Sequence, residues 1–95
     1  MKPSPYIQIR VLISGRVQGV GFRASTAREA SRKKEITGYV RNREDGKVEA
    51  IIAGPPEEVN ALLEWCKKGP FRAEVTQVEI IPEPFDGRFL EFKIL

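Results

Sequence analysis

The stretch Gly15-Arg16-Val17-Gln18-Gly19-Val20-Gly21-Phe22-Arg23 places three glycines within seven residues and closes on an arginine. Residues 6–14 before it alternate between apolar and polar side chains, and residues 22–34 after it have the composition of a helix. Alternation of this kind predicts a strand, so the glycines lie where a strand turns into a helix. Glycine permits tight turns and lets backbone N–H groups come close to a ligand, because it has no Cβ atom.

A strand-to-helix turn of this composition has the parts of an anion site. The first turn of a helix presents unpaired N–H groups and the positive end of the helix dipole. Arg23 can direct two N–H groups onto one anion. The glycine spacing matches neither the nucleotide-binding pattern GxxxxGK[ST] nor the dinucleotide fingerprint. From the residues alone, a phosphate site and a flexible turn with a surface arginine both remain open.

Composition narrows the class of protein. The length of 95 residues predicts one domain, 1–95, with residues 1–5 as a frayed lead-in because they hold two prolines. There is no apolar run of membrane-spanning length and no export signal, and the one cysteine cannot form an internal disulfide. We therefore expect a cytoplasmic protein without a membrane partner. The absence of histidine excludes Ser-His and Cys-His couples and argues against a metal site.

The net charge indicates which kind of ligand the chain favours. The excess of +3 favours small anionic ligands by steering. Basic and acidic residues are interspersed along the chain, which argues little for nucleic acid.

The remainder of the chain predicts a hairpin and a second helix. Asp45-Gly46 stands between two β-prone runs, so residues 38–53 predict a β-hairpin. Prolines at 55 and 56 start a helix that Gly69-Pro70 ends. Its apolar residues recur at helical spacing and form one buried stripe. These residues are Val59, Leu62, Leu63 and Cys66.

A strand over residues 73–81, with Thr76, Val78 and Ile80 on one face, and a short strand near the C-terminus complete the order. The order is β-α-β-β-α-β with a short fifth strand. It predicts an α+β, ferredoxin-like sandwich, in which one antiparallel sheet carries two helices on one face.

Two stretches together resemble the acylphosphatase family. The glycine-rich stretch is one, and residues 38–49, which read G-Y-V-R-N-x-x-D-G-x-V-E, are the other. The resemblance covers nearly the whole chain and includes the predicted element order. It implies hydrolysis of the carboxyl–phosphate bond of an acyl phosphate to a carboxylate and inorganic phosphate, by in-line attack of water.

The resemblance also implies site residues. By position, Arg23 is the arginine that grips the phosphate, and Asn42 is the asparagine that orients the attacking water. The phosphate cradle is implied to be the backbone N–H groups of Gln18, Gly19, Val20, Gly21 and Phe22. Without the glycine stretch, Asn42 would read as a strand-end residue beside a turn.

These residue types suit that chemistry. Phosphoryl transfer spreads charge over three equatorial oxygens, so fixed donors supply most of the catalysis. An asparagine carbonyl can hold a water but cannot remove its proton, so we expect a phosphate oxygen of the substrate to take it. The acyl carboxylate leaves without a strong acid, and we expect no cofactor and no metal. The expected partners are a small acyl phosphate and, in competition, inorganic phosphate or sulfate; a monomer is the default.

Two alternatives and one departure accompany this interpretation. A nucleic-acid-binding ferredoxin-like module would need aromatic residues exposed on the sheet, and few stand there in this pattern. A non-catalytic module that binds acyl phosphate is the other alternative.

Residues 31–37 depart from the family pattern, which puts the end of the first helix in question. Tyr39 stands where the family often has tryptophan, and we expect it to pack against the glycine loop.

Overall fold

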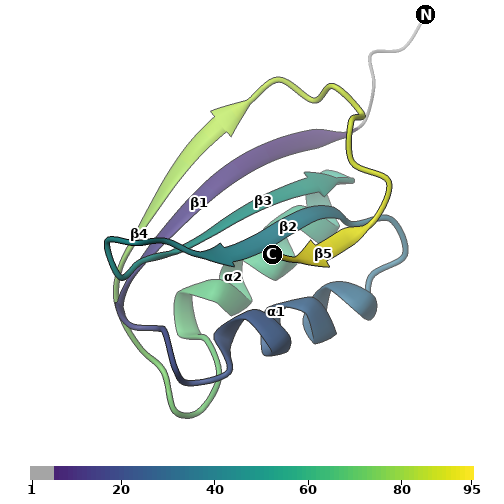
Figure 1. The fold of residues 1–95 in the computed structure, drawn as a ribbon. Coiled ribbons are helices and arrows are strands. Elements are labelled where there is room, and N and C mark those ends of the chain that lie inside the picture. The colour runs from purple at the N-terminus through teal and green to yellow at the C-terminus, as the bar shows by residue number, and fades with distance from the viewer. Residues whose placement is uncertain (1–5) are drawn as a thin grey trace, which may run out of the picture.

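The computed structural model describes residues 6–95, so the predicted lead-in of residues 1–5 lies outside the described residues. Two helices lie on one face of a five-stranded sheet (Figure 1), with strand order β4-β1-β3-β2-β5. The elements are β1 (Ile7–Arg16), α1 (Phe22–Ser31), β2 (Thr37–Asn42), β3 (Val48–Gly54), α2 (Pro56–Lys68), β4 (Glu74–Glu83) and β5 (Phe92–Ile94). The predicted α+β, ferredoxin-like fold is confirmed. Within residues 6–95, neither helix is long and apolar enough to cross a bilayer.

The direction of the last strand departs from the predicted antiparallel sheet. The pairs β1–β3, β1–β4 and β2–β3 are antiparallel as predicted, but β5 runs parallel to β2. The pairing explains this, because β4 runs opposite to β2 and the chain reverses after β4 (Figure 1). The returning segment therefore enters the sheet alongside β2 in the same direction. As a result, both strands end beside the glycine-rich turn.

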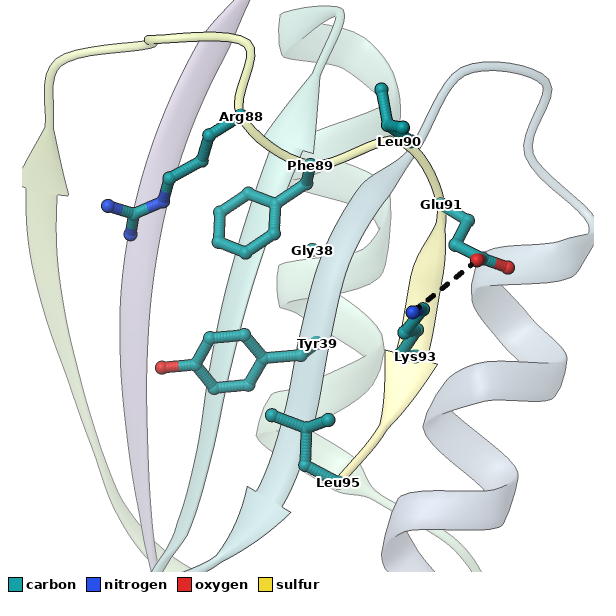
Figure 2. Close-up of a pocket in the computed structure, with 8 residues that line it drawn as sticks. All are labelled: Gly38, Tyr39, Arg88, Phe89, Leu90, Glu91, Lys93 and Leu95. Carbon is teal, nitrogen blue, oxygen red and sulfur yellow. Dashed lines mark ion pairs between the residues drawn. The ribbon is translucent and has the colours of Figure 1, made fainter.

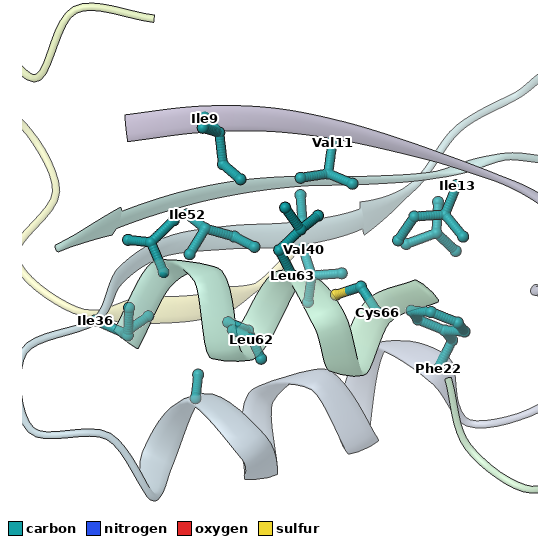
Figure 3. Packing of buried hydrophobic residues seen from close by; sticks show 14 of the residues in the cluster. Ile9, Val11, Ile13, Phe22, Ile36, Val40, Ile52, Leu62, Leu63 and Cys66 are labelled. Carbon is teal, nitrogen blue, oxygen red and sulfur yellow. The ribbon is translucent and has the colours of Figure 1, made fainter. Parts of the chain in front are cut away.

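The core lies between the sheet and the helices (Figure 3). Alternation along β1 turns Ile9, Val11 and Ile13 toward the helices, and the predicted stripe of α2 meets them. Cys66 belongs to this core, where burial raises the pKa of its thiol to about 12. The thiol is therefore protonated and unreactive at neutral pH, and its contribution is packing.

The first helix is shorter than the sequence predicts. It ends at Ser31 rather than at residue 34. The backbone N–H groups of Lys34 and Glu35 donate instead to the Glu58 carboxylate on α2, at 3.5 and 3.0 Å. A side chain from another helix thus takes the donors that would have continued α1. The prediction failed in the region where the chain departs from its family pattern.

The inner face of β4 also differs from the prediction. Val75 and Val78 pack against the core, while Thr76 is exposed. Ile80 pairs with Val11 and so shares the face of Val78 as predicted, although it is 41% exposed. The pairing of β1 with β4 shifts register between Ser14 and Gly15. Such an irregularity adds a residue to one strand and changes which side chains share a face. Two valines three residues apart can therefore lie on the same side.

Candidate active site

The turn between β1 and α1 is anchored at both ends and open in the middle. Val17 and Phe22 are 1% and 2% exposed, so they fix the loop to the core. Between them, Gly19 and Gly21 have φ angles of +75° and +78°. A Cβ atom at either position would meet no atom within 4 Å, so the need for glycine comes from the backbone conformation rather than from a lack of space for that atom. Gly21 is also the N-cap of α1, which has no side-chain cap and no acidic residue in its first turn.

A hollow of about 230 Å³ lies beside this turn. Its lining residues are Val17, Gly19, Gly21, Phe22, Arg23, Ala24, Asn42 and Ile94. The hollow brings together Arg23, near the start of α1, and Asn42, the last residue of β2. Alternation explains the second placement, because Gly38, Val40 and Asn42 share the face of β2 that the helices cover. Arg23 and Asn42, which the sequence analysis singles out and which lie 19 positions apart in the chain, thus line the same hollow.

The Arg23 guanidinium is held by a backbone oxygen of the residue that follows β5. Its Nη1 donates to the backbone oxygen of Leu95 at 3.0 Å. A guanidinium has five N–H donors in a fixed fork, so one such bond orients the group and leaves donors for an anion. A cation at the positive end of a helix is unfavourable by itself. A bound anion would relieve this unfavourable placement.

The other residues of the predicted cradle take different positions. Gly19, Gly21 and Phe22 line the hollow, but Gln18 and Val20 do not. The Val20 side chain is partly buried against the core. The Gln18 side chain reaches the β2–β3 turn, where its Nε2 donates to the backbone oxygens of Arg43 and Lys47 at 2.8 and 3.0 Å. The predicted roles of these N–H groups toward phosphate stay predictions.

Sequence reasoning included Glu49 in the second family stretch but gave no role to this carboxylate, which is buried next to the site. Glu49 on β3 is 1% exposed, on the sheet face opposite the helices. It accepts hydrogen bonds from the Tyr39 hydroxyl at 2.6 Å and from three arginines at 2.8 to 3.1 Å. These arginines are Arg10, Arg41 and Arg43. The available signal in the sequence was a single acidic residue within an otherwise apolar strand. The structure shows that this strand is buried along its whole length.

Glu49 forms ion pairs with both chain neighbours of Asn42. Arg41 and Arg43 flank Asn42 and turn their guanidinium groups to the same carboxylate. Burial alone would raise the pKa of Glu49, but the hydrogen bonds from Tyr39 and Arg41 hold that pKa below its ordinary value. Glu49 is therefore ionised at neutral pH, and its charge pairs with the residues on both sides of Asn42.

Glu49→Gln is expected to lower the free energy of unfolding by about 2–3 kcal/mol, because it leaves three partly exposed arginines around an uncharged group. Urea unfolding followed by circular dichroism measures this loss. Glu64→Gln is the matched control, since Glu64 pairs with Lys67 in solvent and such exposed pairs contribute about 1 kcal/mol or less. Equal losses in the two variants would contradict the importance of burial.

The lowered pKa of Glu49 sets the sign of the pH dependence. Its carboxyl titrates near the ordinary value, about 4.3, in the unfolded chain and lower in the folded chain. The stabilisation by its charge is therefore complete above the unfolded pKa and is lost as pH falls through the folded pKa. The free-energy difference between the unmodified chain and Glu49→Gln should shrink below about pH 4; a difference that grew on acidification would have the wrong sign.

Tyr39 does not pack against the glycine loop as expected. Its ring lies on the sheet face opposite the helices and meets Phe89 edge to face, with centroids 5.8 Å apart (Figure 2). The Arg88 guanidinium lies over the Phe89 ring, 4.7 Å from its centroid. Position in β2 explains the error, because Tyr39 and Asn42 are three residues apart and so point to opposite faces. These side chains border a second hollow of about 270 Å³.

The described residues contain no group of three or more His, Cys, Asp or Glu side chains arranged to hold a metal ion. The site is instead a concave meeting point of a glycine-rich turn, a helix N-terminus, an arginine and an asparagine. With the fold, these features define a ferredoxin-like α+β protein with a hollow beside its first strand-to-helix turn as the candidate active site.

Comparison with known proteins identifies the family. A model of the acylphosphatase family matches residues 9–94. The chain is 48% identical over 88 residues to an acylphosphatase of Methylococcus capsulatus, covering 93% of this chain and 95% of that protein. It is 52% identical over 81 residues to one of Thermococcus kodakarensis, covering 85% and 88%. A solved acylphosphatase from Bacillus subtilis matches with a TM-score of 0.87 and 34% identity, covering 94% and 98%. The chain belongs to the acylphosphatase family.

Proposed function

We propose that the chain is an acylphosphatase that hydrolyses acyl phosphates by in-line attack of water, with Arg23 holding the phosphate and Asn42 orienting the water. Family membership supports the activity. The observation that carries the assignment of roles is the single hollow that Arg23 and Asn42 line together with Gly19 and Gly21. A non-catalytic binding module would need the same anion seat but no residue to orient water.

The phosphate is proposed to sit at the start of α1. There the backbone N–H groups of residues 18–22 and the positive end of the helix dipole favour an anion. Arg23 adds a full charge and paired N–H donors. Because charge spreads over the equatorial oxygens in the transition state, donors already fixed at these positions need not reorganise during the reaction.

The water is proposed to sit between the phosphate and Asn42. The Asn42 carbonyl accepts a hydrogen bond from the water and holds it behind phosphorus, opposite the leaving carboxylate. Within residues 6–95, none of the side chains that line the hollow is a carboxylate or an imidazole. The proton of the water therefore passes to a phosphate oxygen of the substrate. The oxygen–phosphorus bond breaks with its electron pair on the acyl oxygen, which leaves as a stable carboxylate.

The surroundings of the site suit small ligands. The hollow of about 230 Å³ accommodates a phosphate and a small acyl group. Inorganic phosphate and sulfate present the same tetrahedral oxyanion, so both should compete with substrate. We further propose that the protein acts as a cytoplasmic monomer.

Turnover of benzoyl phosphate by the purified chain tests the function, with p-nitrophenyl phosphate as the comparison. The first should be hydrolysed, and the second at least about a hundredfold more slowly, because the site supplies no general acid for a poorer leaving group. Binding of benzoyl phosphate without turnover would instead favour the non-catalytic module. Equal rates on both substrates would contradict the need for an activated phosphate.

Chelation with EDTA is expected to leave the rate on benzoyl phosphate unchanged. The proposed charge neutralisation comes from Arg23 and backbone N–H groups rather than from a metal ion. The measurement is the initial rate before and after dialysis against EDTA, with added magnesium as the control. Loss of activity on chelation, restored by magnesium, would contradict this mechanism.

A further inference from the structure

Gln18 connects the two halves of the site through its side chain. It lies between the buried anchor Val17 and the hollow-lining Gly19, in the loop that is proposed to hold the phosphate. Its Nε2 donates to the backbone oxygen of Arg43 at 2.8 Å and to that of Lys47 at 3.0 Å. An amide nitrogen has two N–H groups, so this one side chain uses both on a single turn.

The two accepting oxygens close the turn that follows Asn42. The Arg43 N–H donates to the Lys47 oxygen at 2.8 Å, which makes these residues the last rung of the β2–β3 hairpin. Arg43 is the immediate neighbour of Asn42. The Gln18 amide therefore fixes the distance between the glycine loop and the Arg43–Lys47 pair. This pair begins one residue after Asn42, the side chain that is proposed to orient the water.

We propose that the Gln18 side chain is a positioning residue that sets the distance between the phosphate seat and Asn42. This inference rests on the proposed function. In-line attack depends on that distance, and a misplacement of about 1 Å can cost about a hundredfold in rate. Breaking the link leaves Arg23, the glycine turn and the helix N-terminus in place. The defect should consequently appear in the chemical step and not in the affinity for phosphate.

Gln18→Met tests this, because methionine has a similar length but no N–H donor. We expect kcat on benzoyl phosphate to fall about ten- to a hundredfold, while the inhibition constant for inorganic phosphate stays within about twofold. Gln18→Glu, which sets carboxylate oxygens against two carbonyl oxygens, should lower kcat at least as far. Thermal unfolding by circular dichroism verifies that both variants fold, as the partly exposed position of Gln18 leads us to expect.

Asp45→Asn is the matched control. Asp45 accepts from the Lys47 N–H at 3.1 Å and from Arg43 Nε at 3.2 Å, so it shapes the same turn without touching the glycine loop. We expect this variant to keep the kcat of the unmodified chain. A kcat loss in Asp45→Asn as large as that in Gln18→Met would attribute the effect to the turn itself and overturn the proposal.

A double-mutant cycle separates positioning from a general structural effect. If Gln18 acts through Asn42, Gln18→Met should have no further effect on kcat in an Asn42→Ala background. Additive losses would overturn the proposal, as would an unchanged kcat in Gln18→Met alone or a parallel loss of phosphate affinity. Failure of the unmodified chain to hydrolyse benzoyl phosphate would instead overturn the proposed function, and this inference with it.

Discussion

Replacing Arg23 with alanine is expected to lower kcat/KM on benzoyl phosphate by about three orders of magnitude or more. Among the described residues that line the hollow, Arg23 carries the one charged side chain, and its guanidinium is already oriented by its hydrogen bond to the Leu95 oxygen at 3.0 Å. Alanine removes both the charge and the paired donors, so competitive inhibition by inorganic phosphate should disappear with the activity. Initial rates with and without phosphate measure both effects.

Two further substitutions define the cause of that loss. Arg23→Lys keeps the charge but not the planar fork, so it should recover only part of the activity. Arg28→Ala removes the same charge from an exposed position on the same helix and should leave kcat/KM near that of the unmodified chain. The fold should survive Arg23→Ala, because Arg23 contributes nothing to the apolar core. An active Arg23→Ala variant would end the assignment of this residue.

Replacing Asn42 with alanine is expected to lower kcat by about two to three orders of magnitude while phosphate inhibition is retained. The reason is the proposed division of roles, in which residues 18–23 hold the phosphate and Asn42, at the end of β2, holds the water; Arg23 and Asn42 both line the hollow. Alanine leaves the seat intact but removes the oxygen that holds the nucleophile in line. Steady-state kinetics with inorganic phosphate as the inhibitor separate the two effects.

Asn60→Ala serves as the control. Asn60 is exposed on α2, so this variant removes the same side chain at a position away from the hollow. Its kinetics should match those of the unmodified chain. The role proposed for Asn42 would be wrong if Asn42→Ala lost phosphate binding and kept its rate. The double-mutant cycle of Gln18 with Asn42 would then no longer test positioning, because Asn42 would not be the residue that Gln18 positions.

Elements with a local cause were predictable from the sequence. The glycine turn, the Asp45-Gly46 hairpin and the stripe of α2 each depend on residues a few positions apart, so pattern and turn chemistry sufficed. The placement of Asn42 beside Arg23 followed from family resemblance rather than from periodicity. Its physical basis is the alternation along β2, which directs Asn42 to the helix side of the sheet.

What escaped prediction depends on contacts between distant parts of the chain. The Gln18 side chain bridges 25 and 29 positions to its acceptors, and Glu49 meets Arg10 across 39. The end of α1 is decided by Glu58 on the other helix, 23 positions from Glu35. The parallel entry of β5 follows from strand order, which no local signal records. These are tertiary effects that override local preference.

The ion cluster around Glu49 has a consequence for how this architecture is used. Modules of related shape that read RNA do so by letting bases stack on flat aromatic faces of an open sheet. Here the Tyr39 hydroxyl donates to Glu49 and its ring meets Phe89 edge to face, while Arg10 and Arg41 from the neighbouring strands pair with the same carboxylate. We therefore expect this surface to stiffen the sheet, while the proposed reaction takes place at the end of the opposite, helix-covered face.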